Sequence, residues 1–212
     1  MENKTLTENT QKQTKSVFNQ TMRELLSRTI KISRCQSNGF RLQKNDDFPF
    51  YIHEGYPNFF IAKENNLLIK DKNKELVYDQ KGTKILDCMC GNIINGKFNS
   101  TFPFFSKKGS FWTNNTTNLL SNITKEQRKF IGPTRNLCNL CGYESVALIP
   151  LKTDDKIIGL IHLADPRENM FTNKKITELE MVADEFSSII KRAYEITKKL
   201  CIIDKMISNS KN

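Results

Sequence analysis

The sequence predicts an α+β fold in which a central antiparallel sheet carries the N- and C-terminal helices packed on one of its faces. Three observations lead to this prediction. Apolar residues near the N-terminus recur at helical spacing, two apolar runs around a charged turn occupy residues 145–165, and a long amphipathic pattern follows from residue 173. The 212 residues suffice for one such domain with extensions.

The N-terminal part predicts a helix followed by two strands. Residues 1–14 are polar and are expected to be flexible. Beyond Asn38-Gly39, the runs FRLQ and FPFYIHEG predict two short strands around the turn KNDD, and Pro57 predicts the start of a short helix. The helical stripe, with steps of four and three, consists of Phe18, Met22, Leu25, Thr29 and Ile32.

Residues 70–135 show little regular periodicity. Irregular stretches of this length inside a domain are usually functional or disordered. This one contains CMCGNIINGKF and an aromatic-rich segment from residue 102 to Trp112, and aromatic residues argue against disorder. We therefore expect an ordered, functional region.

The last third of the chain predicts a strand hairpin and a long helix. ESVALIPLKTDDKIIGLIHLADP gives two strands around a turn, Thr172 is a good N-cap, and Phe171 and Ile176 are spaced as a hydrophobic staple. Up to Ile190 the apolar seam suits the domain core. Beyond Ile190 the helix is longer than a small domain can cover, which favours a partner helix and a homodimer. The seam is Leu179, Val182, Phe186, Ile189, Ala193, Ile196, Leu200, Ile203 and Ile207.

Composition limits the partners. The net charge is +10, but the lysines are scattered and no nucleic-acid-binding motif occurs, so nucleic-acid binding is disfavoured. No apolar run approaches the roughly 18 residues of a membrane span, and the N-terminus lacks the apolar core of a signal peptide. The expected location is cytoplasmic, where six cysteines should be thiols.

Four of these cysteines form two clusters, Cys88 with Cys90 and Cys138 with Cys141, each followed by glycine. A glycine after a ligand thiolate can take the positive φ of a metal-knuckle turn. Four converging thiolates would hold zinc or an iron–sulfur cluster, although Cys-x-Cys is short for structural zinc. Redox or catalytic thiols and buried structural cysteines are the alternatives. Cys35 and Cys201 are unconnected to the clusters.

The chain resembles the GAF domain family over residues 15–195. The strongest segment is residues 142–190, GYESVALIPLKTDDKIIGLIHLADPRENMFTNKKITELEMVADEFSSII. The resemblance implies a GAF-like sheet, with 1–14 as a flexible N-terminus and 196–212 as a helical extension. CMCGNIINGKF, PFFSKKGSFWTNNTTNLL and TRNLCNLCGYESVALIPL are similar to a cysteine-containing subgroup found in prokaryotic sensor proteins.

The resemblance implies a stand-alone sensor that binds a metal, an iron–sulfur cluster or a small ligand between the sheet and its loops. Its signal would pass through the terminal helices to a partner such as a histidine kinase or regulator. The metal ligands would be Cys88, Cys90, Cys138 and Cys141. The candidate pocket residues are Trp112, Asn114, Arg135, Asn136, Tyr143 and Glu144. Arg135 and Glu144 could equally form a loop ion pair.

An enzyme is the alternative interpretation. Free methionine-R-sulfoxide reductases are stand-alone GAF proteins, and MCGN and CNLCGYESVALIP are similar to their cysteine segments. Cys90 and Cys138, with Cys88, would then be the redox residues. The aromatic insertion and the additional Cys141 depart from that pattern. A thioredoxin-like pair is disfavoured, because that motif opens a helix and this one precedes a strand. His162 is a lesser candidate, and His53 is expected at the surface.

Overall fold

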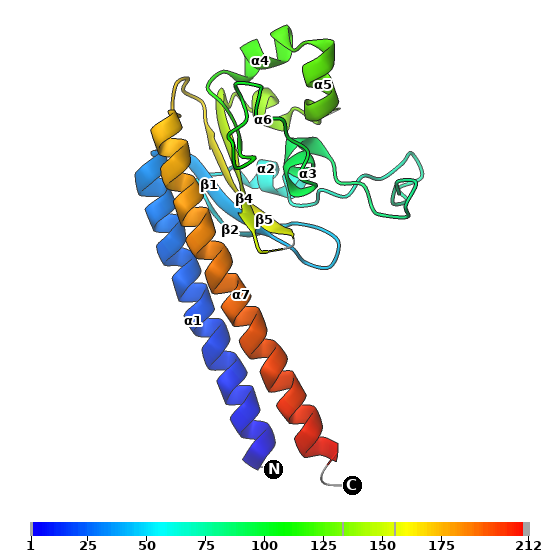
Figure 1. Cartoon of the computed structure of the whole chain (residues 1–212), viewed down its shortest axis with the longest axis vertical. Coiled ribbons are helices and arrows are strands. Elements are labelled where there is room, and N and C mark those ends of the chain that lie inside the picture. Colours follow the sequence, from blue (N-terminus) through cyan, green and yellow to red (C-terminus); the bar gives the residue numbers. More distant parts are fainter. Residues whose placement is uncertain (1, 133, 155, 210–212) are drawn as a thin grey trace.

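A five-stranded antiparallel sheet of order β2-β1-β5-β4-β3 forms the centre of the molecule (Figure 1). The structure, a computed structural model, describes residues 2–132, 134–154 and 156–209, and the side chains among them except those of 2–11, 194 and 197–209. The strands are β1 (Ser37–Leu42), β2 (Phe50–Glu54), β3 (Phe111–Thr113), β4 (Ser145–Lys152) and β5 (Ile157–Asp165). The predicted α+β fold and both predicted strand pairs are confirmed.

The terminal helices α1 (Glu2–Ser33) and α7 (Asn173–Asn209) lie side by side on one face of this sheet (Figure 1). Successive strand residues point to opposite faces, so alternate residues of β4 and β5 pack against the helices. Phe186 of α7 meets Phe40 of β1 there, with 4.9 Å between ring centroids. The core on this face includes Met22, Leu25, Phe40, Ala147, Ile149, Leu151, Ile161, Leu163, Leu179, Val182 and Phe186.

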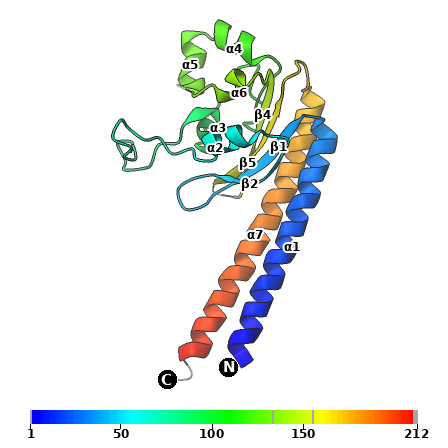
Figure 2. The ribbon, with the colours of Figure 1, turned by 180° about the vertical axis from the view of Figure 1, so that it is seen from behind.

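The other face is covered by short helices and loops, as the view from behind shows (Figure 2). Its core is rich in aromatic residues, among them Tyr56, Phe60, Phe104, Phe105 and Phe111. The aromatic middle segment is therefore ordered, as predicted. The helices on this face are α2 (Asn58–Glu64), α3 (Cys88–Ile94), α4 (Thr116–Asn122), α5 (Lys125–Ile131) and α6 (Leu137–Leu140).

The start of α7 has the predicted signals. The Thr172 hydroxyl accepts a hydrogen bond from the Lys175 N–H at 3.3 Å, and Phe171 and Ile176 are both buried in the core. The first helix begins earlier than the predicted stripe, because α1 starts at Glu2, and the flexibility expected of residues 1–14 stays a prediction.

The seam of α7 is partly covered by the chain itself. It is buried through Phe186, where α1 and the sheet contact it, whereas Ile196 is 48% exposed. Leu200, Ile203, Ile207 and Cys201 lie outside the side chains that the structure describes. The homodimer therefore stays a prediction.

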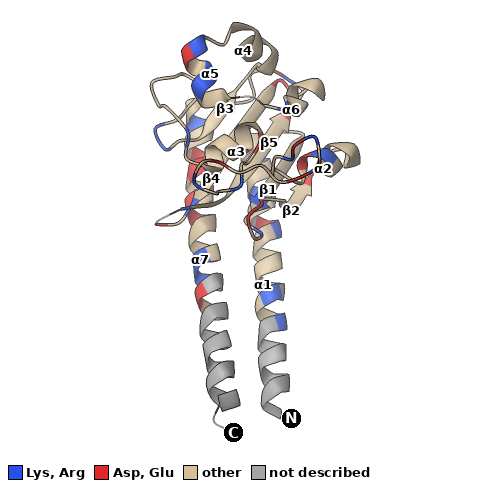
Figure 3. Cartoon of the chain, turned by 90° about the vertical axis from the view of Figure 1, so that its right-hand side faces the viewer, with Lys and Arg blue, Asp and Glu red and all other residues tan. Residues whose placement is uncertain are grey.

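Both basic and acidic residues occur along the helices and loops of the described chain (Figure 3). Exposed ion pairs such as Arg28–Glu185, at 2.7 Å, join α1 to α7. Such pairs typically contribute below about 1 kcal/mol. Among the described residues, we find no helix with the length and apolar character needed to cross a bilayer.

Candidate functional site

Cys88 and Cys90 of the first cluster and Cys138 of the second line one cavity of about 60 Å³, on the sheet face opposite the terminal helices. α3 supplies Cys88 and Cys90, α6 supplies Cys138, and β5 supplies His162. Its remaining lining is mostly apolar and includes Met89, Phe111, Leu119, Ile131, Val146 and Leu148. Segments far apart in the sequence thus place three thiols and an imidazole around one small space.

Cys88 opens α3 in a left-handed conformation, with φ of 65°. Asp87 holds it there, because its Oδ1 accepts the Cys88 N–H at 2.6 Å. A non-glycine residue in this region is strained, and such strain is often found at functional sites. The hydrogen bond from the Cys90 thiol, with those from the backbone N–H groups of Met89 and Cys90, outweighs burial and lowers the pKa of Cys88.

The two glycines after the clusters have different roles. Gly142 has φ of 77°, as expected for a turn glycine. Gly91 instead lies inside α3, and a Cβ there would come within 2.7 Å of the Leu86 backbone. The positive φ that was expected at Gly91 occurs at Cys88 instead. Gly91 is needed because a side chain there would collide with the Leu86 backbone.

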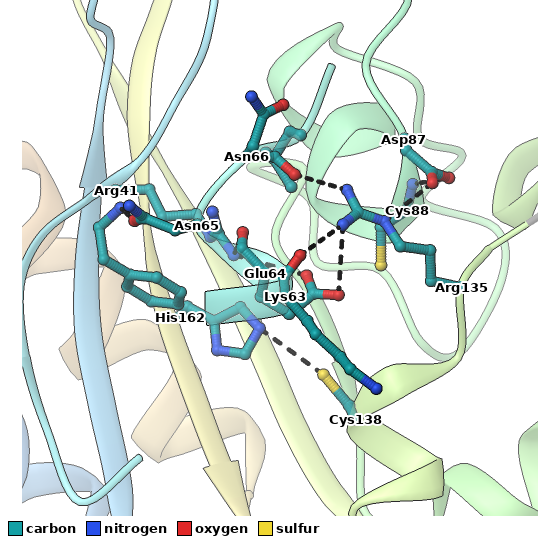
Figure 4. A network of polar contacts seen from close by, with 12 residues as sticks. Arg41, Lys63, Glu64, Asn65, Asn66, Asp87, Cys88, Arg135, Cys138 and His162 are labelled. Carbon is teal, nitrogen blue, oxygen red and sulfur yellow. Dashed lines mark hydrogen bonds and ion pairs between the residues drawn. The ribbon is translucent and has the colours of Figure 1, made fainter. Parts of the chain in front are cut away.

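Cys138 lies against His162. Asn136, with φ of 53°, starts the four-residue helix α6 and directs Cys138 toward β5. Its Sγ is 3.7 Å from His162 Nε2 (Figure 4). The other ring nitrogen, Nδ1, is 2.6 Å from the buried Tyr56 hydroxyl. Burial, and secondarily the Arg41 charge, lowers the pKa of His162 well below its usual value, while burial raises the pKa of Cys138.

A buried ion pair lies beside the thiols. Arg41 and Glu64 have exposed side-chain fractions of 0% and 1%, with 3.5 Å between Arg41 Nη2 and Glu64 Oε2. The Glu64 carboxylate oxygens have no hydrogen-bond partner in the described part of the chain. The hydrogen bond with Cys88, and then burial, raise the pKa of Cys90, burial raises the pKa of Cys138, and the negative charge of Glu64 adds to both shifts. Glu64 therefore acts electrostatically on the cavity without lining it.

Arg135 ties this network to the Cys138 segment. Its Nε is 2.8 Å from Asp87 Oδ2, and its Nη atoms donate to the backbone carbonyls of Lys63 and Asn66 (Figure 4). The loop ion pair with Glu144 is not formed, because Arg135 pairs with Asp87 and Glu64. Arg135 thus joins α2, the start of α3 and the segment before α6.

The other predicted pocket residues do not all line the cavity. Asn136 lines the cavity. Trp112 packs on the helix-facing core, because its neighbour Phe111 takes the cavity side of β3. Asn114 holds the Phe171 backbone through two hydrogen bonds of 2.8 Å, which ties the loop after β3 to the segment before α7.

Tyr143 and Glu144 also have local partners. The Tyr143 hydroxyl is 2.9 Å from the Ser37 hydroxyl, and its ring packs near Phe60. The Glu144 carboxylate accepts hydrogen bonds from Thr117 and Thr116 at the start of α4. These contacts position the loops around the cavity.

The remaining cysteines are less central. Cys141 is the half-buried C-cap of α6 and lies outside the cavity lining. The Cys-x-x-Cys pair thus lies on a short helix before β4, which corrects the expectation that it only precedes a strand. Cys35 packs with the terminal-helix core, and burial raises its pKa to about 12. Among the residues described, no three His, Cys, Asp or Glu side chains are arranged to hold a metal ion.

Sequence reasoning missed Tyr56, Arg41 and Glu64. Arg41 interrupts the otherwise apolar strand run FRL, which is the one available signal for a buried charge. Glu64 ends a short amphipathic helix and looks like a surface residue in the sequence. Tyr56 precedes Pro57, and the sequence there predicts only the start of a short helix. Nothing in that local pattern indicates the hydrogen bond between Tyr56 and His162 of β5.

His162 should make the fold sensitive to mild acid. Its folded-state pKa lies below the ordinary value of about 6.5, so the unfolded chain binds a proton that the folded chain excludes. Its contribution to stability is complete above pH 6.5 and is lost as pH falls toward the folded pKa. We expect a loss of up to about 1.4 kcal/mol per pH unit below 6.5.

Urea unfolding at pH 7.5, 6.5 and 5.5 measures this slope. His162→Gln should flatten it, whereas His53→Gln, at the exposed histidine of β2, should retain it. Equal slopes in wild type and His162→Gln would contradict the assignment.

Comparison with known proteins identifies the fold. No family model and no curated protein sequence matches the chain. A GAF domain of PixJ from Thermosynechococcus elongatus superposes with a TM-score of 0.52 at 8% identity, covering 91% of this chain and 95% of that one. The GAF-B domain of DevS from Mycobacterium smegmatis gives 0.51 at 9% identity, covering 86% and 98%.

A type II free methionine-R-sulfoxide reductase from Thermoplasma acidophilum also superposes. Its TM-score is 0.52 at 10% identity, and the match covers 84% of this chain and 95% of that chain. At such low identities these likenesses establish the fold and leave the function to the chain's own residues.

Proposed function

We propose that this chain, which has the fold of GAF domains, is a sensory or regulatory domain that receives its signal at the cysteine-lined cavity. The observation that carries the proposal is the convergence of Cys88, Cys90, Cys138 and His162 on one small cavity. The composition of its lining, apolar with a few convergent polar groups, is typical of ligand sites, although the cavity is smaller than most of them.

β5 offers a route from the cavity to the terminal helices. His162 points to the cavity, while its neighbours Ile161 and Leu163 pack in the core beneath α1 and α7. A change that displaces His162 therefore moves a strand that both faces share. We propose that the signal reaches α1 and α7 along this strand, with the helix pair as the element whose packing shifts.

The cavity restricts the signal. At about 60 Å³ it holds a few water-sized groups, so the signal is a small ligand, an ion or a chemical change of the thiols themselves. Zinc or an iron–sulfur cluster stays a prediction, and its binding requires the cysteines to turn toward a common centre, since the described side chains show no such arrangement.

Trp112 provides the test, because it is the single tryptophan and packs on the helix-facing core. Methyl methanethiosulfonate, a small thiol reagent, is reacted to completion with Cys138, followed by mass spectrometry. We expect a changed Trp112 emission in wild type and no change in Cys138→Ser treated identically. Unchanged Trp112 emission in modified wild type would contradict the coupling. The metal prediction has a separate test, which is metal and sulfide analysis of anaerobically purified protein.

Reduction of free methionine sulfoxide is the second candidate. The contact between Cys138 and His162 favours it, since sulfoxide reduction needs a nucleophilic thiol, and one protein of the same fold carries that activity. The substrate is far larger than the cavity, so the loops around α6 would have to open. Consumption of methionine sulfoxide with excess dithiol supports this candidate, and its absence removes it.

A further inference from the structure

We propose that Tyr56, His162 and Cys138 form a proton relay that makes Cys138 the nucleophilic thiol of the cavity toward small hydroperoxides. In this relay His162 accepts the thiol proton and Tyr56 is a positioning residue. The proposal rests on the proposed function in taking the cavity as the sensory site. It adds the chemistry by which the site reacts.

The hydrogen bonds of Tyr56 assign the tautomer of His162. The Tyr56 oxygen is 2.6 Å from His162 Nδ1 and 3.0 Å from the His162 carbonyl oxygen. A carbonyl only accepts, so the hydroxyl proton is donated to it, and Nδ1–H donates to the Tyr56 oxygen. Nε2 then carries the lone pair, and it faces Cys138 Sγ at 3.7 Å.

Packing holds this geometry in place. Tyr56 stacks on Phe60 with ring centroids 5.0 Å apart, and both side chains are buried. The His162 ring lies edge-on to Tyr56 and to Phe50, at 5.5 and 5.7 Å. A nucleophile beside a base that a third group orients is the arrangement used for covalent catalysis on many folds.

The resting pair is neutral. Burial raises the pKa of Cys138 and lowers the pKa of His162, so at pH 7 the proton stays on sulfur. The proton moves to Nε2 only when an electrophile arrives, which is general-base catalysis. The titratable and charged groups around the pair and Tyr56 are Arg41 of β1, Glu64 of α2, Cys88 and Cys90 of α3, Cys141 after α6, Tyr143 and Cys35.

The reaction with a hydroperoxide balances within the site. Sγ of Cys138 attacks the terminal oxygen as the O–O bond breaks, and sulfur is oxidised to sulfenic acid. The thiol proton passes to His162 Nε2 and from there to the departing oxygen, which leaves as water or an alcohol. Hydrogen peroxide is small enough for a cavity of about 60 Å³.

The test is the pH dependence of Cys138 oxidation by hydrogen peroxide, measured residue by residue by tandem mass spectrometry on the full chain. Between the ordinary pKa values of an imidazole, about 6.5, and of a thiol, about 8.5, a thiol that reacts through a neutral base should be oxidised at a rate nearly independent of pH, and the wild-type rate should follow this pattern. In His162→Gln, Cys138 can react only as the free thiolate. Its oxidation rate should therefore rise about tenfold per pH unit and lie about 100-fold below wild type at pH 7. Tyr56→Phe should lose about tenfold at pH 7, because Nδ1–H loses its acceptor.

Cys141, which lies outside the cavity, is the internal control, and its rate should be the same in all three proteins. A wild-type rate that rises tenfold per pH unit would overturn the relay, as would a His162→Gln rate equal to wild type with Cys141 unchanged. The Trp112 response at complete modification separates this result from the proposed function. The relay determines the rate of modification, and the sensory coupling determines the emission change once modification is complete.

Discussion

Replacing Glu64 by glutamine is expected to lower the free energy of unfolding by about 3–5 kcal/mol, because it leaves the Arg41 guanidinium buried without a countercharge. Arg41 also donates to the carbonyls of Phe48 and Glu64, at 3.0 and 2.7 Å, and so joins β1 to α2. Urea unfolding at pH 7.5 measures the loss. A cost below about 1 kcal/mol would show that the pair is not held as the structure describes.

The same substitution should make the thiols more reactive. The Glu64 charge adds to the raised pKa of Cys90 and Cys138 and opposes the lowering of the Cys88 pKa, so removing it should lower all three. Alkylation at pH 8 should therefore be faster in Glu64→Gln. The double variant Arg41→Met with Glu64→Leu is the control for loss of stability. It also lacks the Glu64 charge, but removing both charges should cost less stability than removing one.

Phe186→Ala is expected to cost about 3–5 kcal/mol. Phe186 is 0% exposed and packs against Phe40, so its removal leaves a cavity between α7 and the sheet. Met181 of the same helix is 64% exposed, and Met181→Ala should change stability by less than about 0.5 kcal/mol. Equal costs for the two variants would contradict the packing of α7 on the sheet.

Phe186→Ala should also loosen the coupling between cavity and helices. The Trp112 response to Cys138 modification should shrink in this variant, because Trp112 and Phe186 share the helix-facing core. Met181→Ala should leave that response at the wild-type amplitude.

The layers of the fold could be predicted because their signals are local or periodic. The β4–β5 hairpin follows from two apolar runs around a charged turn, and α7 from its N-cap and seam. The long extent of α1 could not be predicted, because its first residues are polar and lack a stripe. The middle region has no periodicity, so its short helices depend on tertiary contacts.

The site could be predicted in part. Cysteine clusters ending in glycine pointed to one shared site, and Cys88, Cys90 and Cys138 do line one cavity. The face of the sheet that Trp112 occupies depends on the register of the three-residue strand β3, which no sequence pattern gave. Tyr56 and Glu64 contribute through contacts with residues distant in the sequence, and such contacts leave no mark in local spacing.

Hydrogen exchange of the terminal helices tests the central claim most directly. Amide exchange is measured by mass spectrometry before and after complete modification of Cys138 with methyl methanethiosulfonate, in wild type and in Cys138→Ser. If the signal passes from the cavity to the helices, amide protection in α1 and α7 should change in wild type and stay unchanged in Cys138→Ser. Altered exchange confined to α3 and α6, with α1 and α7 unchanged, would contradict the account.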